Sequence, residues 1–447
     1  MIEISFEKKD TELEVILYPI NMGKKVDKNT FEKIFSALKG QNYTYHEHPS
    51  SLDIRTKIDE KRISNIRCTI NGSDQVKKYC KTNSITHINQ DVCEYIRKTY
   101  YRDLKSSEIY RPLDLFEYNL RVNLKYEKEL KRNNSTVVNN NSNWKLKEKV
   151  FRYKKRYSFT TPDNLFRYDL TIVKSSERDS KKYLVPKRDF EDSNTLNQEP
   201  EYEVEIEYIG SVNNSIHEME YEDPVEFIKQ KMFDNILFIL QVINDIPYII
   251  SKTKKESVLK KYMELVDINE VRRSWIGPQP VSLEMKNVRD YSDQDWDGII
   301  SIRNSYSVTD KADGERHLLF TNDEGEMYLI NNRSDVSYTG LKCSDMHDSI
   351  FDGELVTRNK KGERIYLFLI FDIYYSNGED IRSRQLQRTK KDKESGIEKS
   401  RLEYLSDLLS NSELEYSETV TGKGVDYKEP LINKNTFLRK KEFYYGD

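Results

Sequence analysis

Two short segments of the chain place glutamates at alternate positions, TELEVIL at 11–17 and EYEVEIEY at 201–208. The glutamates are Glu12, Glu14, Glu203, Glu205 and Glu207. Alternate side chains of a β-strand share one face, so each segment predicts a strand with an acidic face and an apolar face. On an ordinary half-buried strand the polar face simply meets water, and this pattern alone indicates no more than that.

Four further segments show the same alternation with basic or mixed charges. They lie at 52–58, 121–127, 152–156 and 167–171, and the charged residues that share one face of each are Asp53, Arg55, Lys57, Arg121, Lys125, Glu127, Arg152, Lys154, Arg156, Arg167 and Asp169. Six strands that are each apolar on one side and charged on the other are unusual for strands that merely face solvent. If a sheet of these strands closes into a barrel with the charged faces turned inward, its interior holds acids and bases together.

Such an interior would have a definite chemistry. Crowded carboxylates repel one another, and a divalent cation relieves the repulsion. Ligands that are all oxygen suit Mg²⁺ or Mn²⁺, while arginine and lysine side chains bind the oxygens of a polyphosphate. A metal, a basic clamp and a carboxylate that orients water together make a site for phosphoanhydride hydrolysis.

The order of these segments resembles the triphosphate tunnel metalloenzymes, which include RNA triphosphatases of fungi and large DNA viruses. The resemblance spans about 1–225 and implies a metal site made by Glu12, Glu14, Glu205 and Glu207, with Glu203 close by. It implies γ-phosphate binding by Lys154 and Arg156 and a supporting role for Asp169. Arg55 and Glu127 match less specific positions, and Glu127 is a candidate for orienting the attacking water.

A second chemical signal lies in SVTDKADGERHLLF at 307–320, where Lys311 stands two residues before an Asp-Gly pair and Arg316 follows. A lysine amine becomes nucleophilic when its surroundings lower its pKa, and it can then attack an α-phosphate and form a phosphoramidate. Glycine permits close approach of the backbone, and arginine can pair with phosphate oxygens. The simpler interpretation is a surface turn, because Asp-Gly is a common turn dipeptide.

This segment resembles the KxDGxR motif of the covalent nucleotidyltransferases, and three later segments resemble further motifs of that family in the same order. They are INNRSDVSY at 330–338, SIFDGELV at 349–356 and YLFLIFDIYY at 366–375. The resemblance implies that Lys311 is the nucleophile, that Arg316 and Arg333 contact the nucleotide, that Glu354 binds the ribose and that Phe371 stacks on the base. The family's later motifs are not recognisable before Asp447, so we expect an incomplete domain.

These features predict an α+β protein in three parts. An antiparallel β-barrel, the triphosphate tunnel, occupies 1–225, a helical linker 226–270, and a partial nucleotidyltransferase α+β domain 271–447. The polar stretch at 131–143 is expected to be a loop that cannot pack.

The combination resembles the mRNA capping enzymes of large DNA viruses. That family implies metal-dependent removal of the RNA 5′ γ-phosphate, followed by GMP transfer from GTP through a covalent Lys311–GMP intermediate. Mg²⁺ or Mn²⁺, 5′-triphosphate RNA and GTP are the expected cofactor and substrates, and a viral RNA polymerase or a methyltransferase is an expected partner. The alternatives are an ATP-dependent RNA ligase with an end-healing phosphatase domain, or a non-catalytic scaffold of a capping complex.

Composition narrows the class of protein. The chain has 73 Lys and Arg residues against 76 Asp and Glu residues, which argues against a simple basic nucleic-acid coat. Its four cysteines have no zinc-ligand spacing and indicate reduced thiols in an intracellular protein. The N-terminus lacks a signal-peptide pattern, no membrane association is expected, and the Asn-, Lys- and Tyr-rich composition suggests a cytoplasmic viral factory.

Overall fold

The structure is a computed structural model of the chain. It describes residues 1–8, 10–18, 25–60, 62–103, 106–210, 223–244, 248–271, 275–288, 301–303, 306–417 and 432–445. The chain forms two compact units, Met1–Ile243 and Asn244–Asp447. The division falls inside the segment predicted as a helical linker. Helix α6 (Pro224–Asn244) belongs to the first unit apart from its last residue, and α7 (Lys252–Leu265) belongs to the second.

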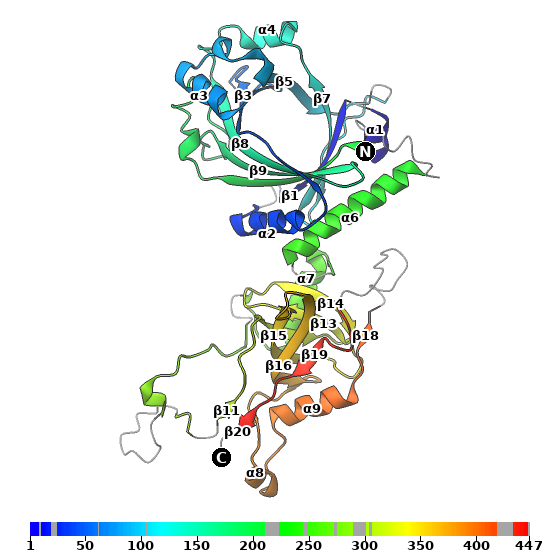
Figure 1. The fold of residues 1–447 in the computed structure, drawn as a ribbon. Coiled ribbons are helices and arrows are strands. Elements are labelled where there is room, and N and C mark those ends of the chain that lie inside the picture. The colour runs from blue at the N-terminus through cyan, green and yellow to red at the C-terminus, as the bar shows by residue number, and fades with distance from the viewer. Residues whose placement is uncertain are drawn as a thin grey trace. The chain divides into compact units, whose positions relative to one another are not determined.

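The first unit is built on a closed antiparallel β-barrel, seen end-on in Figure 1. Within the described residues eight strands form the ring, and pairing of the last strand with the first closes it. In ring order they are β1 (Thr11–Leu17), β10 (Glu201–Tyr208), β9 (Phe166–Ser175), β8 (Lys149–Thr160), β3 (Ser51–Thr56), β4 (Ile66–Asn71), β5 (Cys93–Tyr100) and β7 (Leu120–Glu129). Two short strands lie outside the ring. Strand β2 (Thr44–Glu47) pairs with β8, and β6 (Leu113–Leu115) pairs with β7.

The hydrophobic core of this unit lies outside the ring. Leu13, Val15 and Leu17 of β1 are buried on the outer face, where a strand's period of two places them opposite the glutamates. Helix α2 (Lys28–Lys39) packs its Phe31 ring 5.1 Å from that of Tyr202 on β10. Elsewhere on the outer face lie α3 (Ser73–Thr82) and α4 (Ser135–Asn141). The polar residues are therefore left to line the interior.

The stretch predicted to be an unpacked loop at 131–143 contains α4, so that prediction was wrong. Asn134 caps the helix by accepting a hydrogen bond from the Thr136 amide at 2.9 Å, which satisfies an otherwise orphaned donor. Val137 is fully buried in the core of the first unit. Tertiary packing of one valine face outweighs the weak helix propensity of the asparagines.

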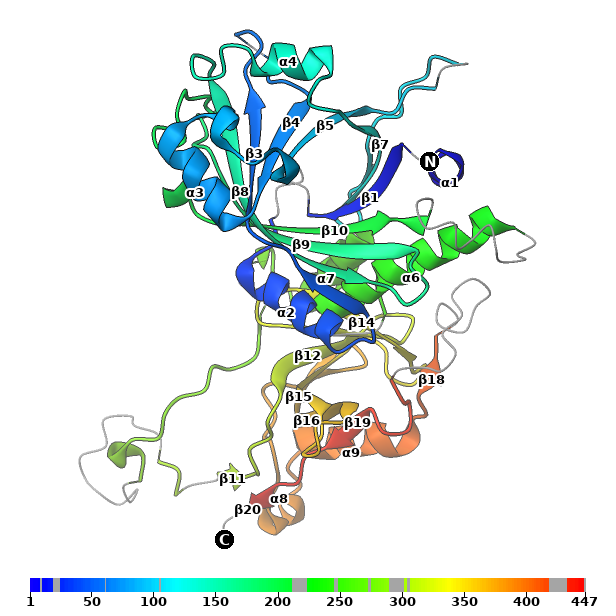
Figure 2. The same cartoon turned by 45° about the horizontal axis from the view of Figure 1, so that its top comes forward.

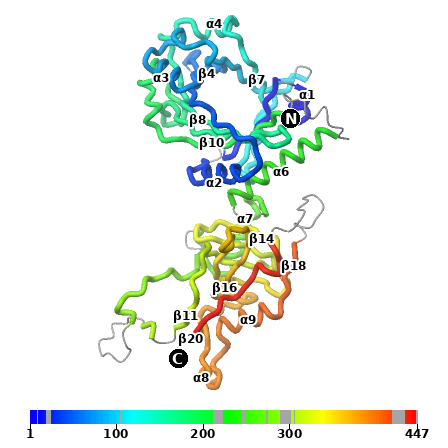
Figure 3. Tube along the Cα trace, in the orientation of Figure 1, coloured from blue at the N-terminus to red at the C-terminus, as the bar shows by residue number. Residues whose placement is uncertain are grey.

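The second unit has a mixed sheet, visible from two directions in Figures 1 and 2. Its order is β17 (Glu379–Asp380), β16 (Arg364–Ser376), β15 (Ser349–Arg358), β12 (Glu315–Thr321), β13 (Glu326–Ile330), β14 (Val336–Lys342) and β18 (Glu415–Tyr416). Near the C-terminus, β19 (Leu438–Lys440) pairs with β16 in parallel, and β20 (Tyr444–Tyr445) pairs with β11 (Ser307–Val308). The red trace of Figure 3 follows this final segment.

Helices complete the second unit. Tyr262 of α7 is fully buried, with its ring 5.7 Å from that of Phe320 on β12. Helix α9 (Arg401–Asn411) begins with a capping box between Ser400 and Glu403 and buries Leu405. The short helices α1 (Ile2–Glu7) and α8 (Lys390–Glu394) lie at the edges of their units. In the part of the chain that the structure describes, no helix has the length and hydrophobicity needed to cross a bilayer.

Candidate active sites

The acidic faces of β1 and β10 meet inside the barrel. Their antiparallel register places Glu14 directly opposite Glu207, and Glu205 opposite Ile16. Like charges directly opposite on neighbouring strands are destabilising. The strand ring of the barrel therefore brings together carboxylates that repel one another unless positive charges lie nearby.

Two lysines supply part of that charge. The Lys98 ammonium on β5 contacts the Glu12 carboxylate and lies 3.6 Å from Glu14 and 3.5 Å from Glu127. Lys125 on β7 also contacts Glu14. Burial opposes ionisation of Glu14, but the charges of Lys98 and Lys125 outweigh it and lower its pKa to about 2.

The neighbouring glutamates respond in the opposite way. Burial and the charge of Glu14 raise the pKa of Glu12 to about 8. Burial and the charges of Glu14 and Glu203 raise the pKa of Glu205 to about 7, and burial also raises the pKa of Glu207. The acidic cluster therefore carries fewer negative charges at neutral pH than its four carboxyl groups could.

These residues suit a hard divalent cation. Among the described residues no three Asp, Glu, His or Cys side chains are already gathered around one point in a ready metal site. The donors of the cluster are nevertheless all carboxylate oxygens, and the Lys98 ammonium already lies between Glu12 and Glu14. The raised pKa values of Glu12 and Glu205 come partly from mutual repulsion, which a cation would relieve.

The basic face of β8 lines the same interior. The Lys154 ammonium lies 2.6 Å from Asp53 on β3, and the Arg156 guanidinium lies 2.9 Å from Asp169 and 3.7 Å from Glu205. Burial lowers the pKa of Lys154 to about 8 despite Asp53. The cations are thus held in place by acids of neighbouring strands.

Asp169 on β9 is the best-connected carboxylate of the barrel. It is almost fully buried and accepts hydrogen bonds from Ser158 at 2.5 Å and from the guanidinium groups of Arg156 and Arg167. This arrangement fixes the direction of Arg156. The predicted supporting role of Asp169 is consistent with its geometry and stays a prediction.

Arg55 on β3 differs from these cations. It makes no ion pair within the described residues, and burial together with the charges of Arg67 and Arg152 lowers its pKa. Arg152 itself lies 2.5 Å from Glu203. Arg55 therefore offers a guanidinium whose donors are not committed to a carboxylate.

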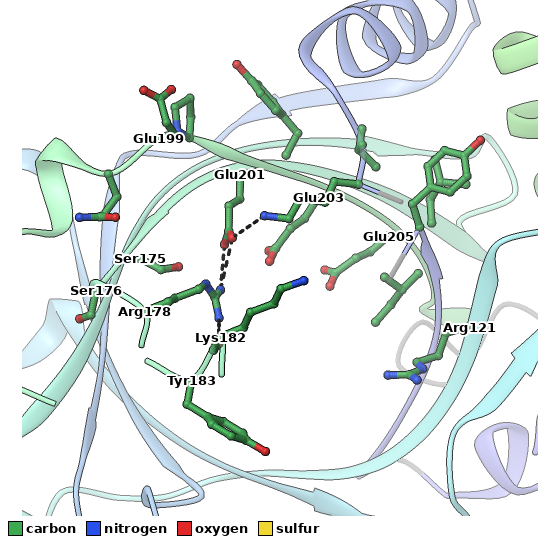
Figure 4. A pocket seen from close by; sticks show the side chains of 18 of the residues that line it. Arg121, Ser175, Ser176, Arg178, Lys182, Tyr183, Glu199, Glu201, Glu203 and Glu205 are labelled. Carbon is green, nitrogen blue, oxygen red and sulfur yellow. Dashed lines mark hydrogen bonds and ion pairs between the residues drawn. The ribbon is translucent and has the colours of Figure 1, made fainter. Parts of the chain in front are cut away.

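A large cavity opens at the end of the barrel where β9 ends and β10 begins. Its volume is about 1450 Å³, and Figure 4 shows Arg121, Glu203 and Glu205 reaching into it from the strands. Arg178 and Lys182 reach into it from the connection between β9 and β10. The interior is thus accessible from this mouth.

Sequence reasoning missed several of these groups. Arg67 was overlooked because it lies in the short segment IRCTIN. Lys98 was overlooked because the apolar Ile96 interrupts the polar face of its strand. Arg178 and Lys182 belong to no strand and gave no periodic signal. Alternation of Arg67, Thr69 and Asn71 could have revealed β4 as a further lumen strand.

The second site surrounds Lys311, which lies between β11 and β12. Its side chain is 91% exposed, and its ammonium lies 3.9 Å from the Asp313 carboxylate. The Gly314 amide donates a hydrogen bond of 2.8 Å to the Glu354 carboxylate on β15. A Cβ at Gly314 would lie 2.5 Å from the Leu355 carbonyl oxygen, so only glycine allows this close approach.

Arg316 is held firmly beside this loop. Two of its nitrogens donate to the two oxygens of buried Asp352 at 3.0 and 2.5 Å, and its guanidinium carbon lies 5.5 Å from the ring centres of both Trp275 and Phe371. Tyr374 also donates to Asp352. Asp352, which the sequence did not single out, therefore fixes the position of the Arg316 guanidinium. The same guanidinium is the cation that lies over the Phe371 ring.

Three of the residues predicted for the nucleotide site come together on β12, β15 and β16, namely Arg316, Glu354 and Phe371. Arg333 lies in the turn between β13 and β14. Its side chain is exposed and makes no hydrogen bond or ion pair within the described residues. Its predicted contact with the nucleotide, like the roles of the other residues, stays a prediction.

Comparison with known proteins bears on this second unit. Residues 244–429 match the family model described as mRNA capping enzyme, catalytic domain. The second unit carries a capping enzyme catalytic domain. A probable mRNA-capping enzyme of Acanthamoeba polyphaga mimivirus is 29% identical over 235 residues, which are 52% of this chain and 16% of that protein. An mRNA-capping enzyme of Danio rerio is 26% identical over 118 residues, 25% of this chain and 18% of that protein.

The matched residues therefore cover less than a fifth of either capping enzyme. Solved structures of the mimivirus capping enzyme triphosphatase match 54% of this chain and 94% or 93% of theirs, at 16% identity and TM-scores of 0.34 and 0.36. The S. pombe Pct1 RNA triphosphatase matches 53% of this chain and 82% of its own at 14% identity, with a TM-score of 0.27. Resemblance to a viral-type capping enzyme, predicted from the motifs, is confirmed.

Proposed function

We propose that this chain catalyses two successive steps of mRNA 5′ capping, with hydrolysis of the RNA 5′ γ-phosphate in the barrel as the first. One observation carries this proposal. The acidic faces of β1 and β10 and the basic face of β8 line the same closed interior, with Arg156 bridging Asp169 and Glu205. A triphosphate end needs both faces at once, one for a metal ion and one for its own oxygens.

In this proposal Lys154, Arg156 and Arg55 bind the phosphate oxygens. Asp53 orients Lys154 and Asp169 orients Arg156 before the substrate arrives. These side chains therefore need little reorganisation when the phosphate binds. A Mg²⁺ or Mn²⁺ ion held by Glu12, Glu14, Glu205 and Glu207 would supply Lewis-acid polarisation of the γ-phosphate. Glu203 lies next along β10 and is engaged by Arg152.

Glu127 is the proposed group that orients the water. Its carboxylate lies on the acidic side of the interior, 3.5 Å from Lys98 and 3.7 Å from Arg67. The water oxygen would form a bond to the γ-phosphorus, its proton would pass to Glu127, and the bond from the γ-phosphorus to the β-bridging oxygen would break. The products are inorganic phosphate and RNA with a 5′-diphosphate end.

The second proposed step belongs to the capping enzyme domain. The Lys311 amine would attack the α-phosphorus of GTP, release pyrophosphate and form a Lys311–GMP phosphoramidate, from which GMP passes to the diphosphate end. Arg316, Arg333, Glu354 and Phe371 are the proposed nucleotide contacts. A partnership with a viral RNA polymerase or a methyltransferase stays a prediction.

The deciding experiment measures release of labelled γ-phosphate from 5′-triphosphate RNA, with and without Mg²⁺ or Mn²⁺. We expect metal-dependent release that is lost in Glu14→Gln. The matched control is Glu32→Gln, because Glu32 is an exposed glutamate of α2 on the outside of the barrel. Undiminished release by Glu14→Gln would contradict the proposed site.

The same preparation distinguishes the other possibilities. Incubation with labelled GTP and with labelled ATP separates capping from ligation, since an adduct formed from ATP alone indicates an RNA ligase. A well-folded chain that releases no phosphate and forms no adduct would favour the non-catalytic scaffold.

A further inference from the structure

A small hairpin, Arg178–Leu184, stands in the connection between β9 and β10; we refer to it as the mouth hairpin. Arg178 and Leu184 pair as an isolated bridge. The Asp179 carboxylate accepts from the amides of Lys181 and Tyr183 at 2.9 and 2.8 Å, and Lys182 takes a left-handed φ of 67°. Such aspartate-centred turns order a loop locally, so the hairpin presents its side chains in fixed directions.

The mouth hairpin is tied to the rim of the barrel. The Arg178 guanidinium donates to the Glu201 carboxylate at the start of β10, at 3.1 Å, and to the Lys182 carbonyl, also at 3.1 Å. The Val185 amide donates to the Glu177 carbonyl at 2.8 Å. These bonds anchor the hairpin at both ends and leave its tip projecting.

The tip borders two openings into the interior. The cavity of about 1450 Å³ reaches Glu203 and Glu205, and a second cavity of about 1080 Å³ reaches Arg55 and Arg152. Both are also lined by the same residues of the hairpin, Arg178, Lys181, Lys182 and Tyr183. Figure 4 shows Arg178, Lys182 and Tyr183 extending into the space enclosed by the strands. A polymer whose end lies in the barrel would pass beside this tip.

The chemistry of the tip differs from that of the interior. Most lumen cations have carboxylate partners, whereas Lys181 and Lys182 form no ion pair within the described residues. Tyr183 is 71% exposed and makes no ring contact there. One exposed tyrosine is unremarkable alone, but an aromatic ring between uncommitted cations is the composition of a platform for single-stranded nucleic acid.

We propose that the mouth hairpin binds the first nucleotides of a single-stranded RNA whose 5′-triphosphate occupies the barrel. Tyr183 stacks on a base, and Lys181 and Lys182 pair with backbone phosphates. This inference rests on the proposed function of the barrel. It makes the hairpin the element that distinguishes an RNA 5′ end from a free polyphosphate, because a short polyphosphate fits the basic face without reaching the tip.

The first test measures the affinity of the full chain for a fluorescent 5′-triphosphate RNA of about ten nucleotides, by anisotropy without divalent metal. We expect Tyr183→Ala to weaken binding about 10-fold, the typical value of one base stack. Tyr183→Phe should bind like the wild type, because the ring alone is needed. The matched control is Phe233→Ala, since Phe233 is an exposed aromatic residue on the outer helix α6. Equal affinity of Tyr183→Ala and wild type would overturn the proposal.

The second test concerns the lysines. In the double variant Lys181→Ala/Lys182→Ala, the negative slope of log Kobs against log salt should become shallower by about 1.4, since each contact to a single strand contributes about −0.7. Lys77→Ala/Lys78→Ala on the outer helix α3 is the matched control and should leave the slope unchanged. An unchanged slope in the first double variant would show that these lysines do not contact the backbone and would refute their role.

Inorganic tripolyphosphate separates this inference from the proposed function. Its metal-dependent hydrolysis should be equal in wild type and Tyr183→Ala, while hydrolysis of triphosphate RNA at low concentration falls in the variant. If neither substrate is hydrolysed but Tyr183→Ala still weakens RNA binding, the hydrolytic function fails and the RNA platform stands. If both are hydrolysed and RNA binding is unaffected by Tyr183→Ala, only the platform fails.

Discussion

The barrel interior and the Lys311 loop place their charged groups in opposite environments. In the barrel, Glu14 is 3% exposed and is surrounded by Lys98, Lys125 and Asn123 from two other strands. In the capping enzyme domain, Lys311 is 91% exposed and has one carboxylate, that of Asp313, within 4 Å in the described residues. One site is assembled by a closed sheet, whereas the other is carried by a loop.

The difference shows what each site needs in order to react. A closed sheet fixes its charged groups before substrate arrives, so electrostatic preorganisation is built into the register of the strands. A loop that is exposed to solvent carries no such fixed set of charges. The proposed role of Lys311 would therefore need further groups brought near it together with the nucleotide.

The largest effect that would sharpen this comparison is in the loop. Replacing Lys311 by Ala should abolish the covalent GMP adduct completely, because Lys311 is the proposed nucleophile. The adduct is measured by gel after incubation with labelled GTP. Phosphate release from triphosphate RNA should stay within about twofold of wild type, as expected for independent sites. An adduct that persists in Lys311→Ala would place the nucleophile elsewhere.

The next effect concerns the acidic cluster of the barrel. Glu205→Gln should reduce metal-dependent phosphate release on the order of 10²- to 10³-fold, the usual result of removing one electrostatic contact to a transition state. Initial rates with labelled RNA give the value, and Glu32→Gln serves as the exposed control. The GMP adduct should be unchanged. Equal loss of both activities would indicate general unfolding instead.

A smaller effect tests whether the second site also has a rigid part. Asp352→Asn should destabilise the second unit by about 3 kcal/mol, because it leaves the Arg316 guanidinium without its buried partner. Urea unfolding followed by tryptophan fluorescence measures the change. Glu398→Gln is the matched control, since Glu398 pairs with Arg384 at a similar 2.6 Å but on the surface, where such pairs contribute less than about 1 kcal/mol. Equal costs for the two variants would contradict a buried clamp.

The smallest effect lies in the pH dependence of the barrel. Burial lowers the pKa of Lys154 to about 8, so this lysine is cationic below pH 8 and loses its proton above it. The kcat/KM for triphosphate RNA should therefore fall up to about tenfold between pH 7 and pH 9, since this ratio reports the free enzyme. Lys154→Arg should remove the fall, because arginine stays charged. A profile that Lys154→Arg leaves unchanged would assign the titration to another group.

Much of the barrel could be predicted from local pattern. Alternation of charged and apolar residues identified the lumen faces of β1, β8, β9 and β10, because a strand's side chains repeat every two residues. The same reasoning failed at 131–143, where α4 forms because Val137 finds a place in the core. It also missed Lys98, whose neighbour Ile96 hides the polar face of β5.

The Lys311 loop shows a different balance. The order Lys311, Asp313, Gly314 and Arg316 was informative without any structure, and the close approach of Gly314 to the Leu355 carbonyl agrees with its need for glycine. The role of Asp352 was invisible, because a buried aspartate in a strand has no distinctive sequence pattern. The antiparallel pairing of β12 with β15, which places Arg316 opposite Glu354, is a tertiary feature that local sequence does not reveal.

Local sequence patterns were enough to predict which residues share a face of each strand and which lysine stands beside an Asp-Gly turn, since both are local properties of the chain. Tertiary structure alone decided that Glu14 lies opposite Glu207, that Lys125 reaches Glu14 across 111 residues of chain, and that the mouth hairpin borders the opening. The physical reason is that closing a ring joins segments distant in sequence. Their register then depends on all the strands of the ring together.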